Sequence, residues 1–400
     1  MKPRLLILTN RLIVGGISND VIPLAYHLRS EFDILILHGE KEESEADATF
    51  LLRNYPGLNI KKIPAFRKQT NFVKDAIAWF AILREIKNFK ADIVHTHGAK
   101  SGFLGRSAAY MYKVPGILHT YHGHHFHSYY NRFISGFLLR TEKELARITT
   151  KIIAISEWQT KELTEIYNIV PSKKIRTISI GIEDKEIMLD PEKQRCCFRK
   201  KYAVEKDVIV IGIAGRMVAI KNLKLFVQVA AKLLSSSSKK LCFFIIGDGI
   251  LKNQIQQECT ALNVNYTANS EEKANVIFTS WIEDIMPAMH ALDIIALTSN
   301  NEGTPMSLIE AQFCGKPVVA TNAGGVRDIV VNNETGFLVE PGDSGMLYDK
   351  LKLLIENDEL RRAMGIKAAQ FARSNFSKQK EIESYKLLYK SLLAVDDMKK

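Results

Sequence analysis

Short apolar segments of β type alternate with longer helical patterns along the chain, and this alternation limits the fold more than any other feature. Five such segments lie in the first half, at residues 4–9, 33–38, 91–97, 116–123 and 151–156. Five more follow in the second half, at residues 208–216, 241–249, 275–281, 292–299 and 316–325. Apolar strands separated by helices are typical of parallel sheets covered by helices. We therefore predict two α/β units, each with its own parallel sheet.

A change in composition separates the two series of strands. Residues 178–193 combine a glycine, a proline and clustered charge, which is typical of a domain boundary. The chain has 400 residues, enough for two or three domains of about 100–200 residues each. We expect an N-terminal domain over residues 1–182 and a C-terminal domain over residues 183–377. The helical pattern of residues 378–400 is expected to pack back on the N-terminal domain.

The net charge of +11 is concentrated in the first half of the chain. Residues 1–180 hold 26 Lys and Arg against 16 Asp and Glu, whereas residues 181–400 hold 29 against 28. A local basic excess attracts phosphate, nucleic acid or an anionic membrane surface, and it is equally typical of a solvated surface. No nucleic-acid-binding module is recognisable, so we expect no nucleic-acid partner.

Two segments of the basic half, residues 67–80 and 130–147, mix cations with large apolar residues. This composition suits contact with an anionic membrane, which we expect as a further partner. Five apolar residues in and after the first segment recur at helical spacing: Phe72, Ala76, Trp79, Phe80 and Leu83. We interpret them as one buried helix face. The two interpretations conflict, because a buried face cannot contact lipid.

The five cysteines are odd in number and lack the spacing of a metal or disulfide site, which fits a reducing compartment. The apolar run near the N-terminus is too short for a signal peptide, and no apolar span of about 18 residues follows. We expect a cytoplasmic protein, and the basic half adds the expectation of peripheral contact with the cytoplasmic face of a membrane.

Residues 300–325, NNEGTPMSLIEAQFCGKPVVATNAGG, place two glutamates around a turn and a predicted helix start. Glu302 precedes the turn, and Glu310 follows in an apolar run. Carboxylates held on a turn and a helix suit a ligand rich in hydroxyl groups. Pro305 fits a first helical turn, whose free N–H groups can meet a phosphate. The simpler interpretation is that one glutamate caps the helix and the other is a solvated charge.

Glycine-bearing loops follow several of the predicted strands. They are Gly15-Gly16, Gly215-Arg216, Gly247-Asp248-Gly249 and Glu302-Gly303. Ligands of open parallel sheets bind beyond the carboxyl ends of the strands, so we expect these loops to face shared space. The first loop, NRLIVGGISNDV, lacks the GxGxxG spacing, which argues against a nicotinamide oxidoreductase.

Taken together, these motifs resemble the retaining GT-B glycosyltransferases of family 4, also called glycosyl transferases group 1. GRMVAIKN (215–222), GDG (247–249), the 302–325 segment and ETGFLVEPGD (334–343) are similar to the nucleotide-sugar domain of that family. DIVHTHGAKSGFLGR (92–106), HTYHGHHF (119–126) and IIAISEWQTKEL (152–163) are similar to its acceptor domain. The resemblance covers nearly the whole chain. It implies an α/β fold of the GT-B type, in which two Rossmann-like domains face each other across a cleft.

The resemblance also implies roles for individual residues. Arg216 and Lys221 match the basic pair that holds the donor diphosphate and stabilises the leaving nucleotide, so that no metal is needed. Glu310 matches the acceptor of hydrogen bonds from the ribose, and Glu302 the contact to the transferred sugar. His122 matches the position that places or polarises the acceptor. The implied donor-binding set is Gly15, Gly16, Gly215, Arg216, Lys221, Gly247, Gly249, Glu302, Gly303, Thr304, Pro305, Met306, Ser307 and Glu310.

The function implied is a retaining transferase that moves a sugar from a nucleoside diphosphate sugar, with UDP-sugar preferred, to a hydroxyl of a glycan or lipid-linked glycan. Such an enzyme acts in surface polysaccharide or glycoconjugate synthesis and keeps the anomeric configuration without a covalent carboxylate. No cofactor besides the nucleotide-sugar co-substrate is expected. A sugar-nucleotide epimerase or hydrolase of the same fold remains an alternative, as does a non-catalytic binding protein. The sugar, the acceptor and the linkage are not specified by the sequence.

Seven of the ten histidines lie close together in the sequence: His95, His97, His119, His122, His124, His125 and His127. Clustered imidazoles can bind a metal ion. In the sequence, however, no carboxylate or thiol accompanies the set, and we predict no metal site. Apart from His122, we expect these histidines at the surface or behind the site.

Overall fold

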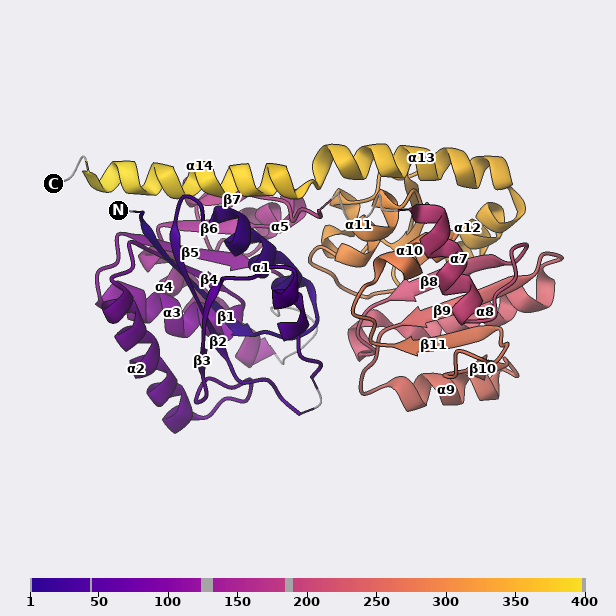
Figure 1. The fold of residues 1–400 in the computed structure, drawn as a ribbon, viewed down its shortest axis with the longest axis horizontal. Coiled ribbons are helices and arrows are strands. Elements are labelled where there is room, and N and C mark those ends of the chain that lie inside the picture. The colour runs from indigo at the N-terminus through magenta and orange to yellow at the C-terminus, as the bar shows by residue number, and fades with distance from the viewer. Residues whose placement is uncertain (1, 44, 124–131, 184–189, 398–400) are drawn as a thin grey trace. The chain divides into compact units, whose positions relative to one another are not determined.

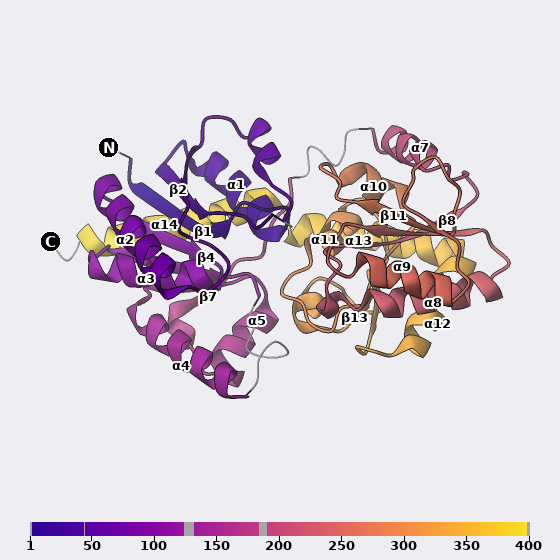
Figure 2. The ribbon, with the colours of Figure 1, turned by 90° about the horizontal axis from the view of Figure 1, so that it is seen from below.

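The computed structural model describes residues 2–43, 45–123, 132–183 and 190–397. The chain divides into two compact units, shown in Figures 1 and 2. Unit 1 consists of Met1–Gly181 and Lys378–Lys400, and unit 2 consists of Ile182–Ser377. Each unit has one seven-stranded sheet. The prediction of two parallel α/β units is confirmed.

The sheet of unit 1 has the order β3-β2-β1-β4-β5-β6-β7, and every pair of neighbours is parallel. Its strands are β1 (Arg4–Arg11), β2 (Asp33–Gly39), β3 (Asn59–Ile63), β4 (Ile93–His97), β5 (Gly116–Tyr121), β6 (Lys151–Ala154) and β7 (Ile175–Thr177). The order reverses between β1 and β4. In open parallel sheets a ligand crevice forms at such a reversal, beyond the carboxyl ends of the strands.

Helices cover both faces of this sheet. The longer ones are α1 (Gly16–Leu28), α2 (Phe72–Phe89), α3 (Ala99–Met111), α4 (Arg132–Ile148), α5 (Glu157–Lys161) and α14 (Lys378–Asp397). Leu24 of α1 and Tyr385 of α14 belong to the core on one face, and Ile82 of α2 and Leu104 of α3 belong to the core on the other. Short helices at Thr49–Arg53, Glu162–Ile166 and Ser172–Lys174 complete the unit. The C-terminal helix α14 thus packs within unit 1 (Figure 1).

The sheet of unit 2 has the order β10-β11-β9-β8-β12-β13-β14 and is also parallel throughout. Its strands are β8 (Ile209–Ala214), β9 (Leu241–Ile246), β10 (Tyr266–Thr267), β11 (Val276–Ser280), β12 (Ile294–Leu297), β13 (Val318–Thr321) and β14 (Gly336–Val339). Almost all residues of β8, β9, β12 and β13 are buried. This is expected of central strands that are covered on both faces.

Two sets of helices sandwich the sheet of unit 2. The helices are α7 (Pro191–Lys201), α8 (Leu223–Ser236), α9 (Lys252–Ala261), α10 (Met286–Ala291), α11 (Met306–Phe313), α12 (Ser344–Glu356) and α13 (Asp358–Asn375), with short helices at Ala219–Lys221 and Gly324–Asp328. α8, α9 and α12 share one core, whereas α7, α10 and α11 share the other. Among the described residues of both units, none of the helices is long and apolar enough to cross a membrane.

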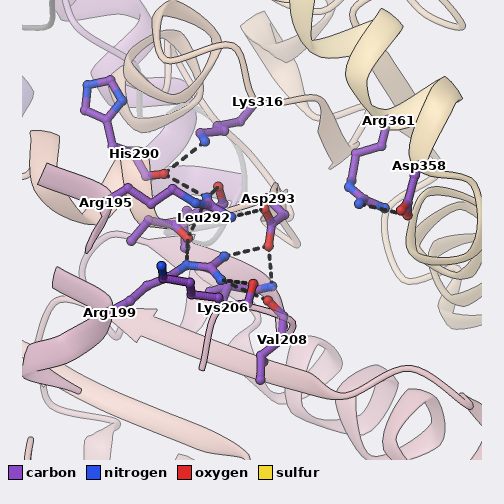
Figure 3. Close-up of polar contacts among 12 residues, drawn as sticks. Arg195, Arg199, Lys206, Val208, His290, Leu292, Asp293, Lys316, Asp358 and Arg361 are labelled. Atoms are coloured by element: carbon purple, nitrogen blue, oxygen red, sulfur yellow. Dashed lines mark hydrogen bonds and ion pairs between the residues drawn. The ribbon is translucent and has the colours of Figure 1, made fainter. Parts of the chain in front are cut away.

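A buried charge cluster ties α7 to the sheet of unit 2 (Figure 3). The carboxylate of Asp293 accepts hydrogen bonds from Arg195 and Arg199 of α7, each at 2.7 Å, and from the N–H of Val210 at 2.8 Å. Burial opposes ionisation of Asp293, but the two arginines outweigh it and hold the pKa of this carboxyl below its usual value. Breaking a buried pair of this kind leaves an uncompensated charge and is strongly destabilising.

The predicted buried face of α2 is wrong in part: Trp79 and Leu83 pack against the core as expected, whereas the other three residues are exposed. The helix begins after Asn71, whose side chain accepts a hydrogen bond from the N–H of Lys74, as in a standard N-cap. Its buried residues are Ala78, Ile82 and Ile86, which pack toward the sheet. The residues expected in the core include Phe72, which is 90% exposed, Phe80, which is 64% exposed, and the exposed Ala76. Helical spacing identified an apolar stripe correctly but not the side of the helix that packs.

Candidate active site

The donor-binding residues predicted for unit 2 lie at one edge of its sheet. β8, β9, β12 and β13 lead into the loops that carry them. Gly215 and Arg216 follow β8, Gly247 and Gly249 follow β9, and residues 302–307 lie between β12 and the first turn of α11. Because the strands are parallel, these loops leave the sheet at the same edge. The structure therefore brings the predicted residues of this unit together.

Lys221 and Glu302 form an ion pair between two of these loops. Nζ of Lys221 lies 2.6 Å from Oε1 of Glu302, and the two side chains are 18% and 12% exposed. Ser299 donates a second hydrogen bond to the same oxygen at 2.5 Å. The hydroxyl of Thr298 donates to the carbonyls of Lys221 and Asn222, at 2.9 and 3.0 Å, and so ties the loops together. An ammonium has three donors, so Lys221 can still bind an anion while it holds Glu302.

The glycine pair after β13 sets the position of Glu302. The N–H of Gly325 donates to the carbonyl of Glu302 at 3.2 Å. Gly324 has a φ of 57°, and a Cβ at this position would collide with the same carbonyl oxygen. Only glycine combines this backbone conformation with so close an approach. The second glycine turn of the 300–325 motif therefore supports the turn that carries Glu302.

Helix α11 begins without a capping side chain. Pro305 occupies the N-cap position and makes no side-chain capping hydrogen bond. The N–H groups of Met306 and Ser307 belong to that turn, where no intrahelical acceptor is available. They add to the positive end of the helix dipole and, with the preceding Gly303 and Thr304, form a start of the kind that binds phosphate groups.

Glu310 lies on α11, one turn beyond Met306, and is only 7% exposed. Burial, with a smaller contribution from the charge of Asp284, raises the pKa of this carboxyl to about 7. Among the described residues, none donates a hydrogen bond to its side chain. A buried carboxyl without a donor has free capacity to accept hydrogen bonds from the hydroxyls of a ligand.

Gly247 and Gly249 have a packing role of their own. Gly247 has a φ of 126°, and a Cβ there would collide with the carbonyl of Gly215. A Cβ on Gly249 would lie 2.6 Å from the carbonyl oxygen of Met217. The loops after β8 and β9 are therefore in direct contact, and their predicted role in donor binding stays a prediction. Arg216, in the same loop, is exposed and pairs with no acid in the described part of the chain.

Unit 1 carries the remaining predicted residues. Gly15 is the N-cap residue of α1, Gly16 is its first residue, and no side chain caps this helix either. A Cβ on Gly15 would meet no atom within 4 Å, so the space in front of the helix start is open. α1 follows β1, at the point where the strand order reverses. An open helix start at this edge suits an anionic group.

His122 follows β5, and its side chain is 7% exposed. Its Nε2 lies 2.8 Å from Nδ1 of His97 and 3.9 Å from Oδ2 of Asp20. Burial lowers the pKa of His122, although Asp20 opposes this, and burial lowers the pKa of His97 well below its usual value. Both rings are therefore neutral near pH 7. Nδ1 of His122 is buried and has no hydrogen-bond partner among the described residues.

The carboxylate beside these histidines escaped the sequence analysis, so the expectation that none accompanies them is wrong. Asp20 comes from α1, and Lys378 of α14 approaches its Oδ1 to 3.3 Å. Lys378 also donates to Glu381 at 2.6 Å, and Glu381 accepts a hydrogen bond from the N–H of Gly181 at 2.7 Å. Burial opposes ionisation of Asp20, but the charge of Lys378 and a hydrogen bond with Glu381 together outweigh it and lower the pKa of Asp20 to about 2. The partners are 358 residues apart, so no local pattern links them.

Asp20, His97 and His122 are also the residues that could hold a metal ion, because one ligand atom from each lies within 4.8 Å of the others. The two ring nitrogens, however, lie 2.8 Å apart, which is a hydrogen-bond distance. Two nitrogen ligands of a tetrahedral zinc ion, with Zn–N of about 2.0–2.1 Å, lie roughly 3.3 Å apart. The ammonium of Lys378 beside Asp20 also repels a second cation. The arrangement fits a hydrogen-bonded network better than a metal site.

Two of the other histidines are buried in the core, so the surface is excluded as their place and a position behind the site is the alternative that remains. His95 is fully buried, with its nitrogens 2.7 Å from the hydroxyl of Tyr389 and 2.8 Å from that of Thr120. His119 is 1% exposed and lies 2.8 Å from the hydroxyl of Thr96. Both rings have partners within the fold. His124, His125 and His127 lie outside the described residues.

Both halves of the chain match models of known protein families. Residues 196–371 match the family described as Glycosyl transferases group 1, and residues 14–186 match the family described as Glycosyltransferase Family 4. The first match covers all predicted donor-binding residues of unit 2. The second covers Gly15, Gly16 and His122. Each motif used for the sequence resemblance thus falls within one of the two matches.

Individual proteins agree with these matches. The chain is 28% identical, over 330 residues, to the UDP-Gal:alpha-D-GlcNAc-diphosphoundecaprenol alpha-1,3-galactosyltransferase of Escherichia coli, covering 82% of each chain. It is also 28% identical, over 312 residues, to the capsular polysaccharide biosynthesis glycosyltransferase CapM of Staphylococcus aureus, covering 76% of this chain and 78% of CapM. Both relatives are glycosyltransferases by name.

The fold also resembles that of solved structures. The crystal structure of Anabaena Alr3699/HepE in complex with UDP and glucose superimposes with a TM-score of 0.81 at 20% identity, covering 97% of this chain and 100% of that one. Sucrose-phosphate synthase from Thermosynechococcus elongatus superimposes with a TM-score of 0.82 at 17% identity, covering 98% and 100%. The two Rossmann-like units, the paired family matches and these relatives together show that the chain is a glycosyltransferase of the GT-B fold and belongs to the group 1, family 4 glycosyltransferases.

Proposed function

We propose that this glycosyltransferase is a retaining enzyme that moves a sugar from a UDP-sugar to a hydroxyl of a lipid-linked glycan in surface polysaccharide or glycoconjugate synthesis. The observation that carries the proposal is the ion pair of Lys221 and Glu302 beside the uncapped start of α11, with Glu310 on the same helix. The E. coli relative is named for a UDP-galactose donor and a diphosphoundecaprenol acceptor. The Anabaena structure contains UDP and glucose.

The diphosphate would bind at the first turn of α11. Met306 and Ser307 offer backbone N–H groups there, and Lys221 and Arg216 offer positive charge. As the bond from the sugar to the diphosphate breaks, negative charge grows on the leaving nucleotide. Fixed cations and N–H groups stabilise this charge more strongly than water does, because they need no reorganisation. We propose that these groups suffice and that the transfer needs no metal ion.

The two glutamates would hold the two ends of the donor. Glu310 is a buried acceptor without a donor, and ribose hydroxyls would supply the missing hydrogen bonds. Glu302 would accept hydrogen bonds from hydroxyls of the sugar through Oε2, since Oε1 is occupied by Lys221 and Ser299. A carboxylate engaged in this way is a positioning group and a poor nucleophile. This supports transfer without a covalent sugar–enzyme intermediate.

His122 would act on the acceptor side. The ring is neutral and is held by His97, and its Nδ1 remains available for a hydrogen bond to a hydroxyl. In a retaining reaction without a protein nucleophile, the departing phosphate oxygen takes the proton of the attacking hydroxyl on the same face of the sugar. His122 then orients the acceptor and need not carry the proton away.

The decisive experiment is nucleotide release by the purified protein with a panel of UDP-, GDP- and ADP-sugars, with and without a bacterial lipid extract. We expect release of UDP that depends on the extract. Glu302→Gln should lower this rate at least tenfold, whereas Glu359→Gln, an exposed glutamate on α13, should not change it. Release of GDP or ADP alone would overturn the donor assignment, and rapid release without extract would favour an epimerase or hydrolase.

Two further measurements address the mechanism. NMR of the first-formed product should show an anomeric proton with the configuration of the donor, and the opposite configuration would refute retention. Turnover should persist after dialysis against EDTA. Loss of activity that added Mg²⁺ or Mn²⁺ restores would refute the proposal that Lys221 and Arg216 replace a metal ion.

A further inference from the structure

Helix α2 presents large apolar side chains to solvent. Phe72 is 90% exposed, Val73 70%, Ile77 55% and Phe80 64%. Val73, Ile77 and Phe80 follow one another at helical spacing, on the side of the helix away from the buried Ile82. Single exposed apolar residues are ordinary, whereas four on one helix mark a contact surface.

The neighbouring helix α3 extends this apolar surface. Phe103 is 48% exposed and Tyr110 is 59% exposed. Ser107 lies between them on the same side of α3, and its hydroxyl accepts a hydrogen bond from the indole N–H of Trp79 on α2 at 2.9 Å. Figures 1 and 2 show α2 and α3 side by side. We call the six exposed side chains the α2–α3 surface: Phe72, Val73, Ile77, Phe80, Phe103 and Tyr110.

The charges around the α2–α3 surface are almost entirely positive. Residues 67–90 contain six exposed cations, namely Arg67, Lys68, Lys74, Arg84, Lys87 and Lys90. The same span has only two acids, and both are paired: Asp75 lies 2.6 Å from Lys100, and Glu85 lies 2.6 Å from Lys61. α3 contains no acidic residue. An approaching anionic surface therefore meets cations without competing carboxylates.

We propose that the α2–α3 surface docks unit 1 on an anionic phospholipid bilayer. A helix that lies in the membrane interface has this composition, with aromatic and aliphatic side chains in the acyl boundary and Lys and Arg at the headgroups. A nucleic acid would match the cations but not Val73 and Ile77. A second copy of the chain would match the apolar residues but would bring like charges together. An anionic bilayer matches both the apolar side chains and the cations around them.

The use of such a surface rests on the proposed function. A lipid-linked acceptor presents its reacting hydroxyl close to the headgroups, so docking raises the local concentration of acceptor at the enzyme. The residues of the α2–α3 surface belong to unit 1, whereas the candidate site groups Lys221, Glu302 and Glu310 belong to unit 2. Docking and sugar transfer can therefore be tested separately.

The test is co-sedimentation of the full-length protein with phosphatidylcholine vesicles, with and without phosphatidylglycerol, at low and high salt. Phe72→Ser/Phe80→Ser removes the two largest exposed apolar side chains of α2, at positions where exposure makes the fold insensitive. Arg84→Glu/Lys87→Glu reverses two charges on the same helix. The matched control is Ile250→Ser/Ile366→Ser in unit 2, where the side chains are 84% and 60% exposed.

We expect wild type and control to bind the anionic vesicles alike, to bind phosphatidylcholine at least tenfold more weakly, and to dissociate as salt rises. Both α2 variants should bind anionic vesicles at least tenfold more weakly, a change of about 1.4 kcal/mol. Absence of wild-type binding at low salt, or equal binding by the α2 variants, would overturn the proposal. A dimer in light scattering that Phe72→Ser/Phe80→Ser abolishes, without vesicle binding, would assign the surface to a second copy.

The same proteins separate this proposal from the proposed function. UDP release in the absence of vesicles, with a water-soluble acceptor, should be unchanged in Phe72→Ser/Phe80→Ser. Vesicle binding without any nucleotide release would leave the docking surface standing and remove the proposed reaction. UDP release that depends on the lipid extract, without any vesicle binding, would support the proposed reaction and remove the docking surface.

Discussion

Glu310 gives the sharpest test, because its substitution should change stability and ligand binding in opposite directions. The carboxyl is buried, and its pKa rises from an ordinary 4.5 to about 7. The native state therefore holds the proton more tightly than the unfolded chain does. Stability from this group is fully present below about pH 4.5 and is lost as the pH rises through the native pKa. Glu310→Gln keeps the shape and removes the titration.

The magnitude follows from the two pKa values. Between pH 5.5 and 8, a native pKa of about 7 and an unfolded value of about 4.5 predict a loss of about 2 kcal/mol in the wild-type free energy of unfolding. The variant lacks this titration, so it should match wild type only below about pH 4.5, and its advantage over wild type should grow by about 2 kcal/mol between pH 5.5 and pH 8. UDP binding should weaken, because hydrogen bonds to a charged group contribute about 1.5–3 kcal/mol, or roughly 10- to 150-fold in Kd.

Urea unfolding of Glu310→Gln and wild type at several pH values, followed by calorimetric titration with UDP, measures both effects. Glu359→Gln serves as the control, because this side chain is exposed and should shift neither quantity. A difference in unfolding free energy that does not change between pH 5.5 and 8 would refute the reasoning about burial. Unchanged UDP affinity would refute the assignment of Glu310 to the ribose.

Three further outcomes are expected. Asp293→Ala should destabilise the protein in urea by about 3–5 kcal/mol, because the buried Arg199 and the partly buried Arg195 lose their partner. Asp358→Ala, which breaks a pair with an exposed acid, should cost less than about 1 kcal/mol, and equal losses would contradict the role of burial. Gly324→Ala should lower kcat/KM for the sugar nucleotide at least tenfold by displacing Glu302, with helical circular dichroism retained; wild-type kinetics would show that the loop adapts. His97→Phe should shift the pH profile and raise KM for the acceptor without changing UDP affinity, whereas a change in UDP affinity alone would exclude a positioning role.

Much of the fold could be predicted from local patterns. Every apolar segment singled out in the sequence contains a strand, because a central parallel strand must be apolar on both faces. The glycine turns also carried structural meaning. Gly247 and Gly324 occupy positions where a side chain would collide with the backbone of a neighbouring loop. The contacts that require these glycines are tertiary, but the glycines themselves are visible in the sequence.

Which face of α2 packs against the sheet could not be predicted in the same way. The spacing of Phe72, Ala76 and Phe80 identifies an apolar stripe, but α2 has a second apolar side that contains Ala78 and Ile82. Which side packs depends on the shape of the sheet and on the fit of small residues against it. Ala78, Ile82 and Ile86 pack toward the sheet and Trp79 is partly buried against the same core, whereas Phe72 and Phe80 remain exposed.

The sequence by itself determined the two parallel α/β units and the glycine loops at the ends of their strands, because spacing and residue type control strands, turns and helix starts. The candidate donor-binding residues followed from the resemblance to the family. Only the tertiary structure decided which charged residues form ion pairs. Lys221 pairs with Glu302, 81 positions away, and Asp20 pairs with Lys378, 358 positions away. The second pair lies beside the hydrogen-bonded His97 and His122. A charge that folding buries needs a partner of opposite charge. Which residue becomes that partner depends on which loops the order of the strands brings to the same edge of the sheet.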